Sequence, residues 1–310
     1  MNPAFSVVFF TTIAGAAQGL VVALALATLA AIPMALAFTS RSLLIAGVML
    51  VIGLLASFGH LGRKERAWRA VLMWRTSWLS RECIVLPAFI GCVALWWLML
   101  QLGASSVSML LVTLVALVLA AVLWLCTAMI YACLRFIEEW AQPLTLVNFV
   151  LIGLSSGFVL TSALAASAGE GGLLRLSGPA ALLFTVAAGI ARSLSLRRNA
   201  ALKHRSTLQS ATGIHSPMLV QKSMGMSAGS FNTREFFHGR TLLVLRNVRT
   251  VFLIGGFVLP ALLALAVLLG APAALWWLAV LSQAIGLQAE RWFFFAQARH
   301  PQNLYYQVVS

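Results

Sequence analysis

The stretch Val7–Ala31, VVFFTTIAGAAQGLVVALALATLAA, contains no charged residue and sets the fold class of the chain. A helix needs about 20 mostly apolar residues to cross the hydrocarbon core of a bilayer. No basic segment precedes this run and no small-residue cleavage site is evident, so we interpret it as a retained helix. Of the 310 residues, 61% are hydrophobic and 9% charged, with a mean hydropathy of +0.96. This composition predicts an integral membrane protein.

Working outward from this run, the apolar segments predict an all-α, polytopic bundle of eight transmembrane helices. The expected spans are, in chain order, Val7–Ala31, Ser42–His60, Glu82–Leu102, Met109–Leu134, Pro143–Ala166, Ser177–Leu196, Val251–Leu269 and Pro272–Phe295. Tight turns are expected at 103–106 and 270–272. The predicted division is helices one to six in 1–196, a basic cytoplasmic insertion in 197–250, and helices seven and eight with a tail in 251–310.

Positive charge is expected to gather at one face of the membrane. With eight spans, the connection between the second and third spans lies on the same side as both termini. This connection, within SFGHLGRKERAWRAVLMWRTSWLSRE at 57–82, and the insertion hold most of the basic residues. Of the 21 Lys and Arg residues, all but Arg41 and Arg175 fall on that side. Because basic connections remain in the cytoplasm, both termini are predicted to be cytoplasmic.

Several ionisable residues lie near the ends of spans at this same face. His60 ends the second expected span, Glu82 begins the third, Arg135 follows the fourth, and Glu290–Arg291 lie near the end of the eighth. Charges at membrane depth are costly and usually functional, so these helix ends are expected to converge on one polar pocket. A histidine and a partly desolvated glutamate are suited to exchange protons with a quinone oxygen. The structural alternatives are an interfacial histidine bonded to a loop carbonyl and an acid at a helix N-terminus.

Neither a haem nor an iron–sulfur cluster is predicted in this chain, and no metal-binding or catalytic residue is expected. A b-type haem needs two facing axial histidines, but His60 and His300 share one rim and the other three fall in the insertion. The cysteines form no C-x-x-C pair and are typical of helix packing; they are Cys83, Cys92, Cys126 and Cys133. If the chain handles electrons, they arrive from a partner.

Short stretches carry a resemblance to a known family. HLG (60–62), RA (66–67) and SRE (80–82) resemble the membrane-anchor subunit of dimethyl sulfoxide reductase, as do GAAQGLVVALAL (15–26) and ERWFFF (290–295). The family tends to have a glycine where this chain has Glu290. Within the family, the chain is more similar to the membrane subunits of cytoplasmic sulfite-oxidising, quinone-reducing molybdoenzymes. That similarity rests on NPAFSVVFFTT (2–12), RFIEEWAQPLTLVNFVLIG (135–153), STLQSATGI (206–214), GSFNTREFFHG (229–239) and ARHPQNLYYQ (298–307).

The resemblance implies a quinone-binding anchor in the bacterial cytoplasmic (inner) membrane. Its partners would be an iron–sulfur ferredoxin-like subunit, docked directly, and a molybdopterin catalytic subunit in the same complex. The anchor would pass electrons from sulfite to ubiquinone or menaquinone. Matched residue by residue, the implied quinone-site residues are His60, Arg66 and Glu82, completed by Arg291 and by Gln18 and Gly19 of the first helix.

The basic connection and the insertion are predicted to dock the iron–sulfur partner. The expected docking residues are Arg63, Lys64, Arg69, Arg75, Phe236 and Phe237. Without the resemblance, the insertion would be interpreted as a loop that attracts anionic lipid headgroups. Nucleic-acid binding is not expected despite a sequence pI near 11.3, because the charge follows membrane topology.

Two alternative functions remain open from the sequence. One keeps the redox role and reverses it, so that quinol reduces dimethyl sulfoxide or polysulfide. The other is a secondary transporter, which predicts internal repeats and charges near the midplane. We find neither feature, and GLSSG at 153–157 has the small-residue spacing that predicts close helix packing instead.

Overall fold

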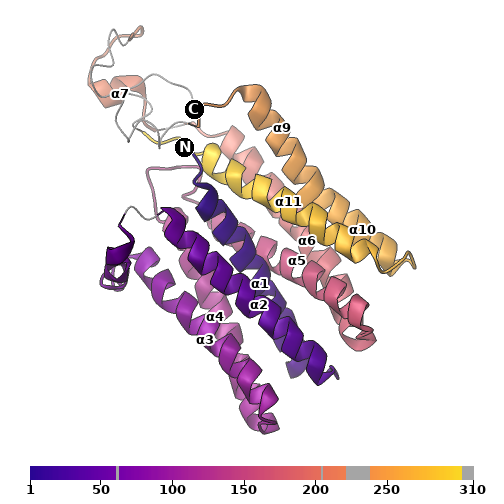
Figure 1. Cartoon of the computed structure of the whole chain (residues 1–310). Coiled ribbons are helices and arrows are strands. Elements are labelled where there is room, and N and C mark those ends of the chain that lie inside the picture. Colours follow the sequence, from indigo (N-terminus) through magenta and orange to yellow (C-terminus); the bar gives the residue numbers. More distant parts are fainter. Residues whose placement is uncertain (61–62, 204, 221–237, 302–310) are drawn as a thin grey trace.

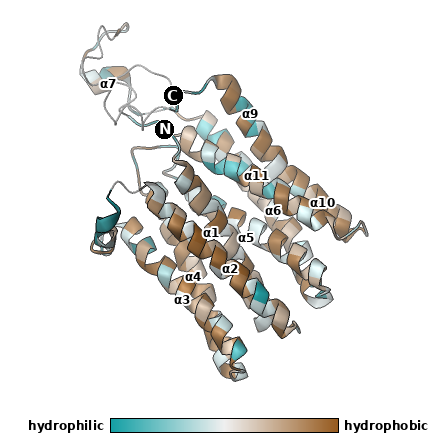
Figure 2. Cartoon of the chain, in the orientation of Figure 1, coloured by the Kyte–Doolittle hydropathy of each residue, from teal (hydrophilic) through white to brown (hydrophobic). Residues whose placement is uncertain are grey.

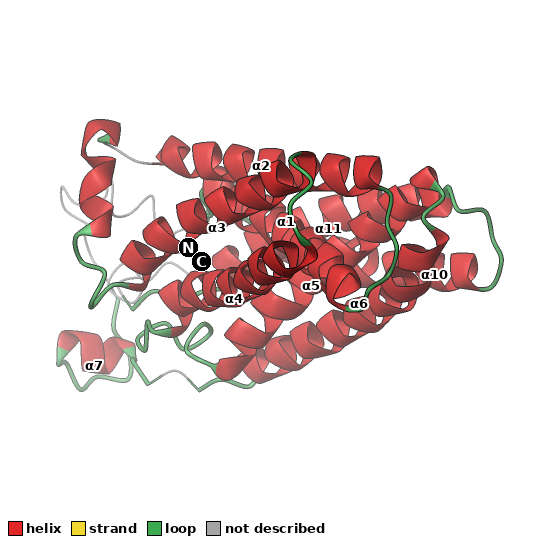
Figure 3. Ribbon diagram, turned by 90° about the horizontal axis from the view of Figure 1, so that it is seen from below, coloured by secondary structure: helices red, strands yellow, loops and turns green. Residues whose placement is uncertain are grey.

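The computed structural model describes residues 1–60, 63–203, 205–220 and 238–301, without the side chain of His60. Within these residues every regular element is a helix and there is no strand (Figure 3). The long helices are α1 (Phe5–Leu29), α2 (Leu36–Ser57), α3 (Trp78–Gln101), α4 (Ser106–Ala132), α5 (Pro143–Ala168), α6 (Gly171–Ala200), α9 (Leu242–Leu253), α10 (Leu259–Leu268) and α11 (Leu275–Ala296). The shorter ones are η1 (Phe58–His60), η2 (Lys64–Val71), α7 (Leu208–Thr212) and the π-helix η4 (Ile254–Val258).

Seven helices of the described chain are long and apolar enough to cross a membrane. They are α1 to α6 and the continuous run Leu242–Leu268, formed by α9, η4 and α10. The protein is therefore a multi-pass membrane protein with an all-helical fold. The eighth expected span, α11, has 22 residues but is not among these seven, because Gln283, Gln288, Glu290 and Arg291 make it more polar. The predicted number of eight spans thus depends on α11.

The helices extend beyond the predicted spans where arginines interrupt the hydropathy. Arg41 lies inside α2 and Arg175 inside α6, although the sequence places both in connections. Arg41 is exposed and its Nε donates to the carbonyl of Ala37, 3.0 Å away. A long basic side chain can reach polar surroundings while its backbone stays helical. The hydropathy profile therefore begins these two spans too late, at Ser42 and Ser177 instead of Leu36 and Gly171. At the other end of the chain α9 begins at Leu242, capped by the hydroxyl of Thr241.

The bundle is centred on α1, which packs against α2, α4, α5 and α11. Its tightest contact is with α5, where Gly19 faces Gly153 and Gly157. A Cβ atom on Gly157 would lie 2.2 Å from the Cα of Gly19, a distance that no packed side chain tolerates. The small-residue spacing at 153–157 therefore performs the close packing that the sequence predicts.

A second close approach joins η4 to α11. A Cβ atom on Gly286 would lie 2.1 Å from the backbone nitrogen of Gly256. The hydroxyl of Ser282 donates to the carbonyl of Gly255 at 2.8 Å, so α11 takes up a backbone acceptor where the helix widens. This contact fixes α11 against the run that precedes it.

The N-terminus, the α2–α3 connection and the end of α11 lie at one end of the bundle (Figure 1). The amino group of Met1 donates to the carbonyl of Ala298 at 3.0 Å. At this end η2, the dark purple coil beside α2 and α3, projects from the helices and is strongly hydrophilic (Figure 2). Arg41 and Arg175 lie toward the opposite end. We call the first end the basic end.

Candidate functional site

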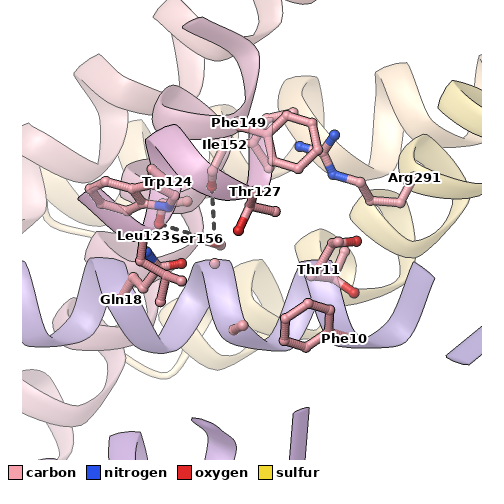
Figure 4. A pocket seen from close by; sticks show the side chains of 14 residues that line it. Phe10, Thr11, Gln18, Leu123, Trp124, Thr127, Phe149, Ile152, Ser156 and Arg291 are labelled. Carbon is pink, nitrogen blue, oxygen red and sulfur yellow. Dashed lines mark hydrogen bonds between the residues drawn. The ribbon is translucent and has the colours of Figure 1, made fainter. Parts of the chain in front are cut away.

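A small cavity lies between α1, α4, α5 and α11, toward the basic end (Figure 4). Its polar lining includes Thr11 and Gln18 of α1, Thr127 of α4 and Arg291 of α11. Its volume is about 20 Å³, which is room for a water molecule and far too little for a quinone ring. Polar groups from three helices thus meet inside the bundle.

Glu82 is joined to this cavity through Thr127. Glu82 lies in the first turns of α3 and its side chain is buried, 6% exposed. The hydroxyl of Thr127, which lines the cavity, donates a short hydrogen bond to Oε1 of Glu82. A hydroxyl both donates and accepts, so Thr127 can connect the carboxyl group to a water in the cavity.

Gln18 reaches the cavity from the middle of α1. Its Nε2 donates to the carbonyl of Ala120 on α4 at 3.1 Å, and the side chain is 3% exposed. This bond fixes the orientation of the amide, because a buried side-chain donor is rarely left without an acceptor. The amide therefore presents a fixed polar group to the cavity.

Arg291 is held at the cavity by an aromatic cluster. Its guanidinium carbon lies 3.8 Å from the ring centroid of Phe149 and 5.6 Å from that of Phe294. Cations are attracted to aromatic faces, more strongly when water is excluded. Arg291 is 2% exposed, and its Nη1 has no hydrogen-bond partner among the described residues. A buried, fixed N–H donor without a partner is suited to an oxygen ligand.

The charge of Arg291 is partly balanced by Glu290, which also binds Arg192 of α6. The distance from Nε of Arg192 to Oε1 of Glu290 is 2.6 Å, and from Nε of Arg291 to Oε2 it is 3.4 Å. All three side chains are at most 2% exposed. One carboxylate thus serves two buried guanidinium groups, which leaves an excess of one positive charge in this cluster of three residues.

Comparison with known proteins agrees with this architecture. The family described as DMSO reductase anchor subunit (DmsC) matches residues 1–285. The chain belongs to this family. It is also 47% identical to the C subunit of the sulfite dehydrogenase of Allochromatium vinosum, over an alignment of 327 residues that covers all of both chains. This chain is therefore a membrane-anchor subunit of a DMSO reductase-family enzyme, a multi-subunit oxidoreductase with catalytic and electron-transfer partners.

Of the residues predicted for the quinone site, some lie at the cavity, some lie away from it, and one has no described side chain. Gln18 and Arg291 line the cavity, and Glu82 reaches it through Thr127. Gly19 does not line the cavity, because its Cα packs against α5. Gly15, one turn earlier on α1, lines the cavity instead. Arg66 is exposed on η2 and lies outside the cavity lining. For His60 only the backbone is described, as the last residue of η1.

Four of the six predicted docking residues lie on the α2–α3 connection. Arg63, Lys64, Arg69 and Arg75 are all exposed, and η2 has no buried residue. Arg69 and Arg75 lie over the rings of the neighbouring Trp68 and Trp74, which are also exposed. Phe236 and Phe237 fall outside the described residues.

Three residues of the site are assigned no role from the sequence. Charge patterning groups Arg192 with the basic loop, but it lies inside α6, two turns before the helix ends. Glu290 is among the ionisable residues expected to converge on a polar pocket, but it departs from the family pattern, so the resemblance assigns it no role and its pairing with Arg192 is missed. Thr127 is one of many hydroxyl residues in apolar helices. The available signal is the isolation of Arg192 and Glu290 in apolar stretches, since such charges usually have a partner.

Proposed function

We propose that this chain is the quinone-reducing membrane anchor of a sulfite-oxidising complex. Sulfite and water would give sulfate, two protons and two electrons in the catalytic subunit. The electrons would pass to a quinone held by the anchor, which takes up two protons and leaves as quinol. The full-length similarity to a sulfite dehydrogenase subunit supports this direction of electron flow.

The observation that carries the proposal is the cavity where Gln18, Arg291 and the Thr127–Glu82 pair meet. The guanidinium of Arg291 would stabilise, through a water in the cavity, the negative charge that the quinone gains, because a preorganised donor in a buried site is effective there. Glu82 would supply a proton through Thr127 and the cavity water. His60, whose side chain is not described, is proposed as a second proton donor from the family resemblance.

The partners are proposed to dock at the basic end. The exposed Arg63, Lys64, Arg69 and Arg75 give a positive surface, and charge complementarity orients an approaching partner. We propose that a ferredoxin-like iron–sulfur subunit binds there and that a molybdopterin subunit binds to it in turn. The iron–sulfur clusters and the molybdenum centre belong to these partners. The anchor binds the quinone, which is either ubiquinone or menaquinone.

The membrane arrangement proposed for the anchor has eight spans. At about 1.5 Å per residue, α11 is long enough to span with its 22 residues. Its polar residues Gln283, Glu290 and Arg291 are buried in the bundle, while Leu281 and Ile285 are exposed. Eight spans put both termini on the basic side, which the charge bias assigns to the cytoplasm of a bacterium.

The decisive experiment uses Glu82→Gln in the purified complex. We expect quinone reduction by sulfite to fall by a factor of roughly 10² to 10⁴, the usual contribution of a proton-transferring group. Sulfite oxidation with an artificial acceptor, which takes electrons from the partner subunits, should be retained. The matched control is Glu65→Gln on the exposed η2. Normal quinone reduction by the Glu82 variant would reject the site, and a wild-type complex that oxidises quinol but no sulfite would reject the direction.

A further inference from the structure

A second, larger hollow lies beside the cavity. It is a groove of about 360 Å³ between α1, α2, α5 and α11, within the membrane-spanning helices. Its apolar lining includes Ile13, Ala16, Met49, Leu160 and Leu164. Ile45 and Ala284 also line it and are exposed, so the groove opens sideways toward the lipid.

One wall of this groove is polar. Gln288 of α11 lines it, and its Nε2 donates to the hydroxyl of Thr12 on α1 at 2.7 Å. The other amide atom, Oε1, is buried and has no hydrogen-bond partner among the described residues. A buried amide oxygen without a partner is unusual in a packed protein. Because it can only accept, it is suited to a ligand hydroxyl such as that of a quinol, the reduced form of a quinone.

The groove and the cavity share part of their lining. Thr12 and Ser156 line both, so the groove and the cavity of Gln18 and Arg291 are direct neighbours. A ligand head in the groove at Gln288, beside Thr12, would therefore lie close to the cavity. The groove has a polar wall at Gln288 and Thr12 and mostly apolar walls elsewhere. Such a lining is suited to a lipid-soluble molecule with a polar head and an apolar tail.

A second groove serves as an internal comparison. It is larger, about 500 Å³, and lies between α6, η4 and α10, with Val186 and Ala261 in its lining. It shares no lining residue with the cavity. The size of a hollow alone therefore does not decide the site. The two grooves differ in the unpartnered amide oxygen of Gln288 and in the lining shared with the cavity.

We propose that the groove between α1, α2, α5 and α11 binds the isoprenoid quinone. The ring lies against Gln288 and Thr12, and the tail follows the apolar walls to the lipid. The volume falls within the usual 300 to 1,000 Å³ of ligand pockets. This proposal rests on the proposed function and deepens it. The cavity then holds the water that passes protons from Glu82 to the ring, so it has no need to admit the ring itself.

The test separates the tail from the ring. Ala284→Trp fills the mouth of the groove from an exposed position. We expect it to raise the KM for decylubiquinone by about tenfold and to change the KM for tail-less duroquinone by less than about twofold. Gln288→Leu removes the contact with the ring and should raise both KM values. Retained sulfite oxidation with an artificial acceptor shows that each variant complex assembles.

The matched control is Ala261→Trp in the second groove, which should leave both KM values unchanged. A photoreactive decylquinone should label α1 or α11. The groove assignment would be overturned if Ala284→Trp and Ala261→Trp gave the same KM for decylubiquinone, or if the photoreactive quinone labelled α6 and α10. Either result would leave the proposed function intact. A wild-type complex that reduces neither quinone would refute the proposed function and this inference with it.

Discussion

Glu290 of α11 and Arg192 of α6 form an ion pair, with 2.6 Å between Oε1 and Nε, and each side chain is only 1% exposed. Glu290 is next in the chain to Arg291, the residue that lines the cavity. The pair therefore joins two helices directly behind the candidate site. Removing one partner of such a pair leaves a buried charge without compensation, which costs far more than the pair contributes.

Glu290→Gln should strongly destabilise the protein, because two buried guanidinium groups would lose their carboxylate. We expect a loss of about 3–5 kcal/mol in the free energy of unfolding, measured by denaturation of the purified protein in detergent. Glu65→Gln on the exposed η2 should change it by less than about 0.5 kcal/mol. Equal stability of the two variants would show that Glu290 is not needed to balance Arg192 and Arg291.

Arg291→Lys keeps the positive charge but loses the planar group that stacks on Phe149 and presents Nη1 to the cavity. We expect the kcat for quinone reduction to fall by a factor of about 10², with electron delivery to an artificial acceptor retained. The matched control is Arg135→Lys, an exposed residue at the same end of the bundle. A Lys variant as fast as the wild type would mean that charge alone suffices.

Hydropathy predicts the helices well because each span must satisfy its own backbone within the membrane. It fails where a charge lies inside a helix. Arg41 and Arg175 shorten the predicted spans although both lie within helices. Arg192 lies inside the predicted sixth span, but its charge is counted with the basic loop that follows, and its burial and pairing are missed. The hydrophobicity of a window cannot distinguish an arginine that ends a span from one that is buried and paired.

The site is predictable only in part, for a related reason. Glu82 and Arg291 are charged residues near the ends of expected spans, so their positions single them out, whereas Gln18 comes from the family resemblance. The pairing of Arg192 with Glu290 and of Glu82 with Thr127 depends on how each helix is rotated in the bundle. Gly19 illustrates the same limit, because it lies one residue from Gln18 and yet faces α5 instead of the cavity.

Gly157→Ala should disturb the contact between α1 and α5, since the added Cβ would lie 2.2 Å from the backbone of Gly19. Overpacking of this kind costs about 1–3 kcal/mol, which detergent denaturation would measure as a lower free energy of unfolding. Gly91→Ala is the matched control, because a Cβ there meets nothing within 4 Å. A substitution of glycine in an open helical position should be neutral or stabilising. If the Gly157 variant behaves like the control, the two helices do not pack as closely as described.

The proposed orientation predicts opposite accessibility of the two ends of the bundle. Cys133, which is exposed and follows α4 at the basic end, should resist a membrane-impermeant maleimide added to intact cells. A cysteine introduced by Ala104→Cys, in the turn between α3 and α4 at the opposite end, should react. Permeabilised cells should show labelling at both positions, which checks that Cys133 is reactive at all. Labelling of Cys133 in intact cells, with Ala104→Cys protected, would invert the topology and move the docking surface outside the cytoplasm.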